Sequence, residues 1–445
     1  MYTQNIVLKH PELNYFLLKI IIMSQKHHQI VIIGAGTAGI TVAAQLLRKD
    51  KKLDIALIDP ADKHYYQAAW TLVGAGTYDY KATERDMKSV IPGGTTWIKD
   101  FVETIDPENN SVTTRDGTRI TYDYLVAAPG IQIDIDALPG LREALQTDSV
   151  CSNYTDPDHT WEVLKNFKGG NAIFTQPATP IKCGGAPQKI MYLADDYFRK
   201  SGVRAKTKVS FITPGSVIFG TEPFKQTLME VVDRKNIELR FFHKITKIDP
   251  KNKKVHFEIM NHADEPEKLY HHKMELGEEF PGKNEVVIPY DMLHLAPPQS
   301  APDFIKQSPI AHQEGPSKGW INVDINTLQH KVYPNVFALG DAAALPTAKT
   351  GAAIRKQAPV LVENLLHVIG NGNELDPGYH GYSSCPLVTG YGKMVLAEFD
   401  YSNERDSDPV ISKFVDTSKE QYSMWLLKKY GLPFMYWNLM LKGKA

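Results

Sequence analysis

The sequence predicts an α/β protein built from two domains with parallel sheets. Near the start, Ile30–Ile33 is a short apolar run of β-branched residues, typical of a buried strand, and glycines follow it at G-x-G-x-x-G spacing. Far downstream, Val336–Leu339 is a second such run and ends in a Gly-Asp pair. Between them, Asn171–Thr175 reads as a strand followed by an amphipathic helix. This order predicts two Rossmann-like domains of the dinucleotide-binding type.

The first glycine-rich loop has the residues that a dinucleotide needs. Gly34 permits the tight turn, Gly36 lets the backbone approach a pyrophosphate, and Gly39 lets the following helix pack against the strand. Thr37 and Ala38 lie between these glycines at the start of the helix, whose N-terminus favours an anion. The alternative is a tight glycine turn without a ligand.

Two acidic residues at strand ends indicate which dinucleotide binds. Asp59 ends a second strand and follows Gly36 by about 20 residues, the usual distance for a ribose-binding carboxylate. Asp341, with Gly340 before it, can hold the ribityl chain of a flavin, and Lys349 and Thr350 precede a helix whose N-terminus can face the flavin ring.

A third stretch, Tyr124–Gly130, ends in Gly130 and resembles the strand and turn before the second domain of flavoproteins with two dinucleotide domains. Together the three stretches resemble the disulfide-reductase-like flavoprotein superfamily. This resemblance implies FAD as the cofactor.

Composition excludes several classes of protein. The chain has 445 residues, 50 Lys and Arg against 51 Asp and Glu, and three cysteines. The balanced charge predicts no nucleic-acid partner, and three cysteines are too few for a disulfide framework. No apolar run reaches the ~20 residues that span a bilayer. No metal site is predicted.

The expected domain boundaries follow from these stretches. Residues 27–140 and 300–385 form the FAD-binding domain, residues 141–299 the second Rossmann-like domain, and residues 386–445 a quinone-site and membrane-interface segment. Residues 1–26 are an N-terminal extension that fits the fold poorly. We expect Met23 to be the true start, and a short anchor or targeting segment is the alternative.

The second domain lacks the phosphate loop of a nicotinamide-dependent reductase. After the strand Asn171–Thr175 the chain reads QPATPIKCGGAPQK, with Cys183 where phosphates would be bound. The later strand runs into Pro214-Gly215-Ser216, which is no phosphate loop either. The sequence therefore favours a redox thiol over NAD(P)H in this domain.

Cys183 and Cys385 are the candidate reactive thiols. Cys183 precedes a helix start at Pro187, and Lys182 and Lys189 are close to it in sequence, so helix dipole and positive charge both favour the thiolate. Cys385 lies in the other half of the chain. The two could meet at a flavin and form a redox-active disulfide without a CxxC motif. The alternative is that each is an inert buried cysteine.

Several longer motifs resemble sulfide:quinone oxidoreductases, in particular their mitochondrial-type branch. These motifs are IKCGGAPQKIMYL, LHLAPP, YPNVFALGDAAALPTAKT, SCPLVTGYGKMVLAEFDY and PFMYWNLMLKG. The resemblance implies that Cys183 and Cys385 are a redox pair that sulfide attacks as a disulfide or trisulfide. It also implies that FAD passes two electrons to a membrane quinone, and that the sulfur leaves to sulfite, glutathione or another thiol.

Two positions bear on that resemblance. Gln188 stands near the place where the bacterial-type branch usually carries a glutamate, a proposed proton carrier, so the general base is left unassigned. Cys151 resembles a third cysteine that links FAD covalently in some bacterial-type members. A structural role is the alternative for Cys151.

The C-terminal part carries the expected quinone and membrane contacts. Lys393 could donate to a quinone carbonyl, and Phe399 and Tyr401 could stack on its ring, although a solvated lysine and core aromatics are equal alternatives. Leu432–Leu441 is apolar and aromatic, is flanked by lysines, and is too short to span a membrane. We expect a peripheral, monotopic protein of a bacterial or mitochondrial inner membrane. A dimer or core-packing tail is the alternative, and a homo-oligomer is left open.

Three other functions compete with this interpretation. A type II NADH:quinone dehydrogenase would need a second glycine-rich loop and no cysteine pair. A flavocytochrome sulfide dehydrogenase flavoprotein should carry an export signal and lack the membrane tail. A flavin-binding redox sensor or scaffold would titrate its cysteines without turnover.

Overall fold

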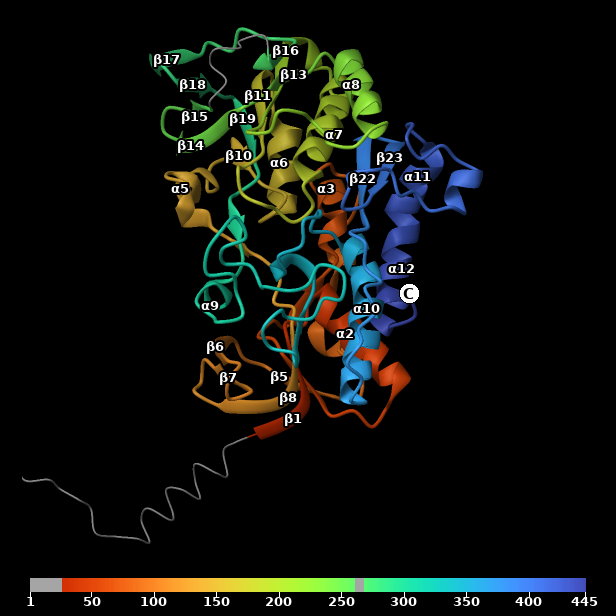
Figure 1. Cartoon of the computed structure of the whole chain (residues 1–445). Coiled ribbons are helices and arrows are strands. Elements are labelled where there is room, and N and C mark those ends of the chain that lie inside the picture. Colours follow the sequence, from red (N-terminus) through yellow and green to blue (C-terminus); the bar gives the residue numbers. More distant parts are fainter. Residues whose placement is uncertain (1–25, 261–267) are drawn as a thin grey trace, which may run out of the picture.

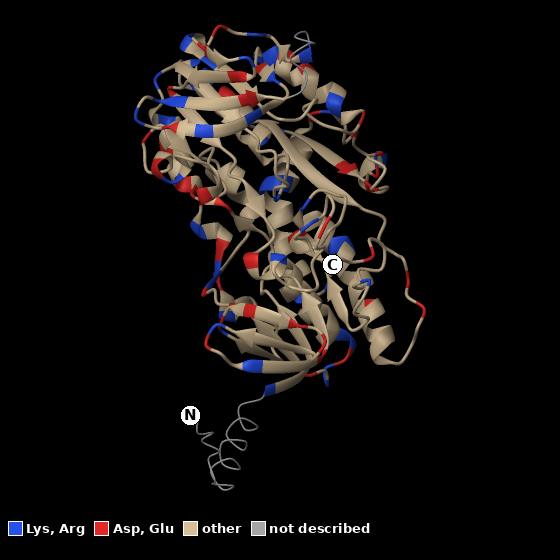
Figure 2. Cartoon of the chain, turned by 60° about the vertical axis from the view of Figure 1, so that its left-hand side comes forward, with Lys and Arg blue, Asp and Glu red and all other residues tan. Residues whose placement is uncertain are grey.

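The computed structural model describes residues 26–260 and 268–445. Two sheet-based domains lie end to end, with the first at the bottom of Figure 1, the second at the top, and the C-terminal helices running along one side of both. The expected extension, residues 1–26, and the expected start at Met23 lie outside the described residues, apart from Lys26, which begins the first strand. Figure 2 shows basic and acidic residues interspersed along both domains.

The first sheet is centred on β1 (Lys26–Ile33), which pairs in parallel with β2 (Ile55–Ile58) and β8 (Arg119–Ala127). Its central strands are covered on both faces, so residues such as Ile30 and Leu57 have no exposed surface. The remaining strands are β5 (Thr95–Ile98) beside β2, β21 (Val336–Ala338) beside β8, and the antiparallel pair β6 (Val102–Asp106) and β7 (Ser111–Thr114).

Two helices join distant parts of this domain. Helix α2 (Thr37–Lys49) follows the glycine-rich loop, and α10 (Gly351–Ile369), far along the chain, packs against it. Because β21 pairs in parallel with β8, the residues after these two strands leave the same edge of the sheet. The architecture thus brings the early and late motifs to one place.

The second sheet is also mainly parallel. It has the order β10 (Val150–Cys151), β19 (Met292–Leu295), β11 (Gly170–Thr175), β12 (Thr207–Ile212), β13 (Glu238–Arg240) and β16 (Tyr270–His271). Its longer described helices are α6 (Pro157–Asn166), α7 (Ala186–Lys200) and α8 (Phe224–Lys235). The α/β prediction with two Rossmann-type domains is confirmed.

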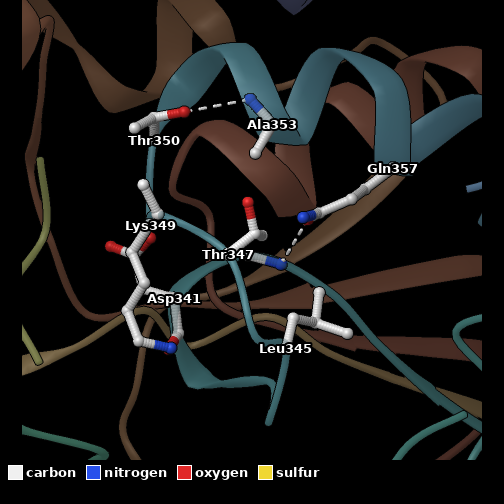
Figure 3. A pocket seen from close by; sticks show the side chains of 9 residues that line it. Asp341, Leu345, Thr347, Lys349, Thr350, Ala353 and Gln357 are labelled. Carbon is white, nitrogen blue, oxygen red and sulfur yellow. Dashed lines mark hydrogen bonds between the residues drawn. The ribbon is translucent and has the colours of Figure 1, made fainter. Parts of the chain in front are cut away.

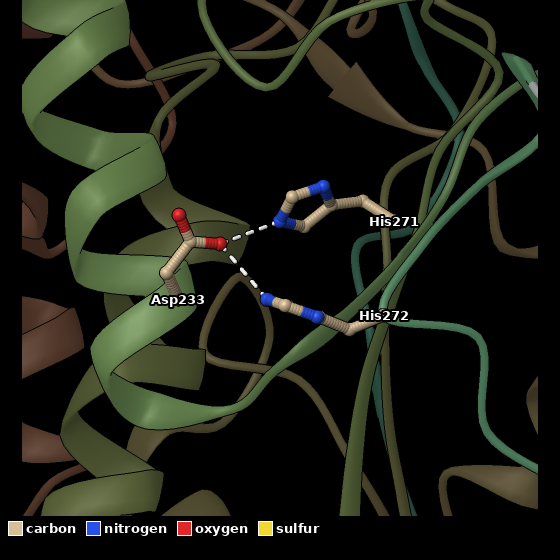
Figure 4. Close-up of side chains that lie close together, drawn as sticks. All are labelled: Asp233, His271 and His272. Atoms are coloured by element: carbon tan, nitrogen blue, oxygen red, sulfur yellow. Dashed lines mark hydrogen bonds and ion pairs between the residues drawn. The ribbon is translucent and has the colours of Figure 1, made fainter.

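An antiparallel sheet extends the second domain. Beside it, two histidines connect the edge strand β16 of the parallel sheet to helix α8. The antiparallel sheet consists of β14 (His243–Asp249), β15 (Lys254–Ile259), β17 (Glu279–Gly282) and β18 (Glu285–Pro289). Figure 4 shows Asp233 of α8 beside His271 and His272, whose Nε2 atoms lie 2.6 and 2.8 Å from one carboxylate oxygen. These contacts tie the short edge strand β16 to α8.

The last part of the chain forms a hairpin and then short helices. β22 (Ser383–Gly390) and β23 (Lys393–Phe399) pair antiparallel. α11 (Tyr422–Leu426) packs against β23, and after a π-helical turn (Leu427–Gly431) α12 (Leu432–Asn438) lies beside the first domain (Figure 1). Within the described ranges no helix combines the length and the apolar character that crossing a bilayer requires.

Short elements complete the fold. They are β3 (Lys63–Tyr65), α3 (Trp70–Val73), β4 (Glu84–Asp86), α4 (Met87–Val90), β9 (Gln132–Ile133), α5 (Leu141–Ala144), β20 (Gln299–Ser300) and α9 (Asp303–Lys306).

Candidate active site

The glycine-rich loop forms an open cradle at the N-terminus of α2. Gly34 has φ +95°, and a Cβ there would lie 2.4 Å from the carbonyl oxygen of Ala128, so a larger residue is excluded. A Cβ on Gly39 would lie 1.9 Å from the Gly34 carbonyl oxygen. At Gly36, in contrast, a Cβ would meet no atom within 4 Å. The space in front of Gly36 is therefore free for a ligand.

Asp59 lies at the rim of this cradle. Its carboxylate accepts hydrogen bonds from the backbone N–H groups of Ala35 (2.7 Å) and Ala61 (2.8 Å). Burial raises the pKa of Asp59, and these two hydrogen bonds oppose the rise. Thr37, on the other side of the loop, shares a hydrogen bond of 2.9 Å with the hydroxyl of Tyr436 from α12.

The late motif forms the opposite wall. Lys349 Nζ donates to the carbonyl oxygen of Asp341 (2.6 Å), and Thr350 caps α10 by accepting from the N–H of Ala353 (3.1 Å; Figure 3). Gly340 N–H donates to the side chain of Gln357 at 2.9 Å. Burial lowers the pKa of Lys349 to about 8, and burial raises the pKa of Asp341. This wall therefore offers a buried ammonium beside a carboxyl group.

One cavity of about 680 Å³ connects these walls with the cysteine region. Its volume lies within the range of ~300–1,000 Å³ that ligand pockets occupy. Its lining includes most of the predicted cofactor residues: Gly36, Thr37, Ala38, Asp59, Gly130, Asp341, Lys349 and Thr350. Gly340 lines a smaller adjoining pocket. Gly34 and Gly39 lie behind the glycine-rich loop and do not line the cavity. The lining also includes Cys183 and Lys189.

The two cysteines meet although about 200 residues separate them in the sequence. Cys183 has φ +53°, and its N–H donates to the Lys349 carbonyl at 2.8 Å, so it is fixed against the late motif. Cys385 lies on β22 and is 2% exposed. A Cβ on Gly185 would lie 3.8 Å from the Cys385 sulfur, which places that sulfur at the start of α7. Both cysteines are free thiols in the structure.

The surroundings of the pair make the two thiols unequal. The hydrogen bond from Cys385, and then the charge of Lys189, hold the pKa of Cys183 well below its usual range. Lys189 Nζ donates to the Cys183 sulfur at 3.0 Å. The same hydrogen bond, together with burial, raises the pKa of Cys385 well above its usual range. Of the two thiols, Cys183 is therefore the one that ionises more readily.

Lys428 is a third member of this region that the sequence analysis missed. It lies in the π-helical turn, is 3% exposed, and donates to the Ala68 carbonyl at 2.8 Å. Burial, and then the charge of Lys189, lower the pKa of Lys428 to about 7. In the sequence it is one of several tail lysines, and the signal that could have found it is its helical spacing from Met424, which is also buried.

Cys151 and Gln188 lie away from the cavity. Cys151 has no exposed surface, and burial raises its pKa to about 12. Gln188 is 3% exposed, and its side chain donates to the Ile218 carbonyl and accepts from the Tyr192 hydroxyl. Both residues therefore occupy structural environments in the second domain.

The three residues predicted to contact quinone do not line the cavity. Lys393 begins β23 and is exposed. Phe399 packs against Phe219, with ring centroids 5.9 Å apart, and Tyr401 donates to the Ile325 carbonyl at 2.7 Å. Strand alternation turns Phe399 away from the cavity, because it lies on the same face of the hairpin as Cys385.

Comparisons with known proteins agree with this geometry. Residues 28–166 match the pyridine nucleotide-disulphide oxidoreductase family. The mitochondrial sulfide:quinone oxidoreductase of Mus musculus is 40% identical over 94% of this chain and 88% of its own length. That of Dictyostelium discoideum is 44% identical over 94% of this chain and 86% of its own. The crystal structure of the Aquifex aeolicus sulfide:quinone oxidoreductase superposes with a TM-score of 0.71 at 21% identity, covering 93% of this chain and 92% of its own. The chain belongs to the sulfide:quinone oxidoreductase family.

Proposed function

We propose that this protein oxidises sulfide at the Cys183–Cys385 pair and delivers the electrons to a membrane quinone, with FAD bound in the 680 Å³ cavity. The observation that carries the proposal is the contact of two cysteines from different halves of the chain, beside Lys189 and against the carbonyl of Lys349.

The residues of the cavity fit FAD. The open space at Gly36 and the uncapped N-terminus of α2 suit a pyrophosphate, and Asp59 at the cradle rim suits a ribose. Asp341 and Lys349 would lie along the flavin end. The chemistry that bound FAD supplies here is the acceptance of an electron pair from the sulfur side and its release to quinone.

The inequality of the two thiols gives a direction to the sulfur chemistry. In the oxidised pair, hydrosulfide attacks the Cys385 sulfur, a new S–S bond forms there, and the Cys183–Cys385 bond breaks with its electrons on Cys183. The thiol with the lower pKa is the better leaving group, and Lys189 stabilises the thiolate that is released. Cys385 then carries a persulfide, whose outer sulfur passes to sulfite, glutathione or another thiol.

The tail supports peripheral membrane binding. Tyr422, Leu426, Tyr430 and Phe434 recur every four residues, and each is exposed, by 64, 39, 61 and 62%. Their exposure places them on the outer surface of the tail, where aromatic rings suit a lipid headgroup region. We infer that this stripe rests on a bacterial or mitochondrial inner membrane and leads the quinone to the cavity.

Anaerobic stopped-flow absorbance tests this function. Mixing the FAD-loaded protein with sulfide should bleach the oxidised flavin band, and a short-chain quinone should restore it. NADH should leave the band unchanged on the same timescale. Bleaching by NADH without bleaching by sulfide would replace the proposal with an NADH:quinone dehydrogenase.

A further inference from the structure

The hairpin of β22 and β23 has two chemically different faces. Its register pairs Ser384 with Glu398 and Pro386 with Leu396, and because side chains alternate along a strand, these four share one face. All four line the cavity. Cys385 lies between Ser384 and Pro386, so it points to the opposite face, toward α7. The hairpin therefore has one side that carries Cys385 and a second side that borders the cavity.

The second side suits a quinone. Pro386 and Leu396 supply an apolar wall, and Ile411 from the following loop adds to the same lining. Polar groups are few and converge at one end, where Tyr382 and Arg355 join Glu398 in the lining. A flat apolar ring with oxygen atoms at its edge needs such a mainly apolar surface with a few fixed polar groups.

Glu398 is the buried acid of this compartment, with 3% of its surface exposed. Its carboxyl accepts hydrogen bonds from the hydroxyl of Tyr382 (2.6 Å) and from the N–H of Asp408 (3.0 Å). Arg355 NH2 lies 3.4 Å from the Tyr382 hydroxyl, and Lys356 lies 5.5 Å from the centre of the Tyr382 ring. Among the described residues, Tyr382, Arg355, Lys356 and the Asp408 carboxylate are the titratable and charged groups around this carboxyl group.

Burial is the largest influence on this carboxyl group. It raises the pKa of Glu398, and the charge of Asp408 adds to the rise, while the two hydrogen bonds and the charge of Arg355 oppose it. The net shift is upward. Glu398 thus keeps its proton to higher pH than an exposed glutamate and can donate it.

We propose that Glu398 donates a proton to the quinone during its reduction, with Tyr382 as the residue that positions its carboxyl group. This inference rests on the proposed function, because the electron pair comes from sulfide. One O–H bond of Glu398 breaks and one O–H bond of the hydroquinone forms. The second proton comes from water, and water also returns the proton to Glu398 after hydroquinone leaves.

The test measures only the quinone half of the reaction, in protein whose flavin has been reduced by dithionite. In Glu398→Gln, reoxidation by a short-chain quinone should slow by roughly 100-fold, the usual contribution of a positioned acid. Reoxidation by ferricyanide, which takes electrons without protons, should keep the wild-type rate. Glu404→Gln, an exposed glutamate in the loop after β23, is the matched control and should react like wild type.

The pH profile separates proton donation from a merely structural role. In wild type the quinone rate should fall as pH rises through the raised pKa of Glu398, and in Glu398→Gln it should stay flat. Tyr382→Phe removes a hydrogen bond that lowers this pKa, so the fall should move to higher pH. Infrared spectra should show one protonated carboxyl band in wild type that Glu398→Gln lacks.

Wild-type quinone rates in Glu398→Gln at every pH would overturn the inference, and so would an equal slowing with ferricyanide. Failure of sulfide to bleach the wild-type flavin would instead overturn the proposed function. Because dithionite replaces sulfide in the Glu398 test, the two failures are distinguishable.

Discussion

Each parallel sheet has a strand, a loop and a helix in the same order, but the two loops differ in what surrounds them. The first loop joins β1 to α2, and the second loop joins β11 to α7. In the first domain, β1 leads to α2, and a Cβ on its N-cap residue, Gly36, would meet nothing within 4 Å. In the second domain, β11 leads to α7, whose N-cap residue is Gly185. A Cβ there would lie 2.7 Å from Leu387 of β22. One helix N-terminus is open and the other is covered.

This difference shows how one architecture serves two kinds of chemistry. An open helix N-terminus with free N–H groups suits a phosphate. A covered one, with Cys183 just before it and Lys189 in its first turns, instead suits a thiolate. The tail contacts both loops, through Tyr436 at Thr37 and through Lys428 near Cys183.

The largest expected effect is the loss of sulfide-driven flavin reduction when either thiol of the pair is removed. Cys183→Ser and Cys385→Ser should each slow sulfide-driven flavin reduction by roughly 1,000-fold or more, because the thiols act as a unit. FAD content should stay unchanged, since the first loop is intact. Stopped-flow absorbance and flavin quantification check both points. Cys151→Ala is the matched control, and normal reduction in both serine variants would refute the disulfide mechanism.

Removing the positive charge at the second loop should have the next largest effect. Lys189→Met should raise the pKa of Cys183, so less thiolate is present at neutral pH and sulfide-driven reduction slows by roughly 10- to 100-fold. The rate of alkylation of reduced Cys183 against pH should show its midpoint moved upward. Lys200→Met, at the exposed end of the same helix, should leave the midpoint unchanged. An unshifted midpoint in Lys189→Met would contradict the electrostatic account.

A substitution beside the first loop should change the affinity for FAD and leave sulfide reactivity unchanged. Asp59→Asn should weaken FAD binding by about 10-fold, because one charge-assisted hydrogen bond to the ribose is weakened. The FAD dissociation constant of the reconstituted protein is the measurement. Asp62→Asn, an exposed neighbour paired with Lys99, is the control. Loss of sulfide reactivity in FAD-saturated Asp59→Asn would show that the two loops are not separable.

The smallest effect should come from the outer face of the tail, which touches neither loop. Phe434→Glu should reduce binding to lipid vesicles by about 10-fold, the loss of one buried aromatic side chain. Turnover with a short-chain quinone should not change. Phe280→Glu, at an exposed phenylalanine of the second domain, is the control. Unchanged vesicle binding in Phe434→Glu would refute the membrane face.

The sequence predicted the fold because its glycine spacing and its short apolar strands are local signals. Asp59 directly follows β2, and Asp341 and Cys183 lie in the loops after β21 and β11, so their position at a sheet edge could be inferred from the strands. The two-domain α/β architecture and the place of the family motifs followed from these residues.

The residues that the sequence did not reveal depend on side-chain direction. Lys428 points inward from the π-helical turn and is buried, although it is one of several lysines in the tail. Glu398 faces the cavity and Phe399 does not, because the hairpin register decides which face each residue takes. The hairpin also packs against α7, which is distant in sequence.

The central claim, that Cys183 and Cys385 form the redox pair, is tested most directly by disulfide mapping of the oxidised protein by mass spectrometry. The account predicts a peptide pair joined through Cys183 and Cys385, directly or with an added sulfur atom, that disappears after anaerobic treatment with sulfide and a thiol acceptor. Two unlinked cysteines in the oxidised protein, or a link that involves Cys151, would contradict it.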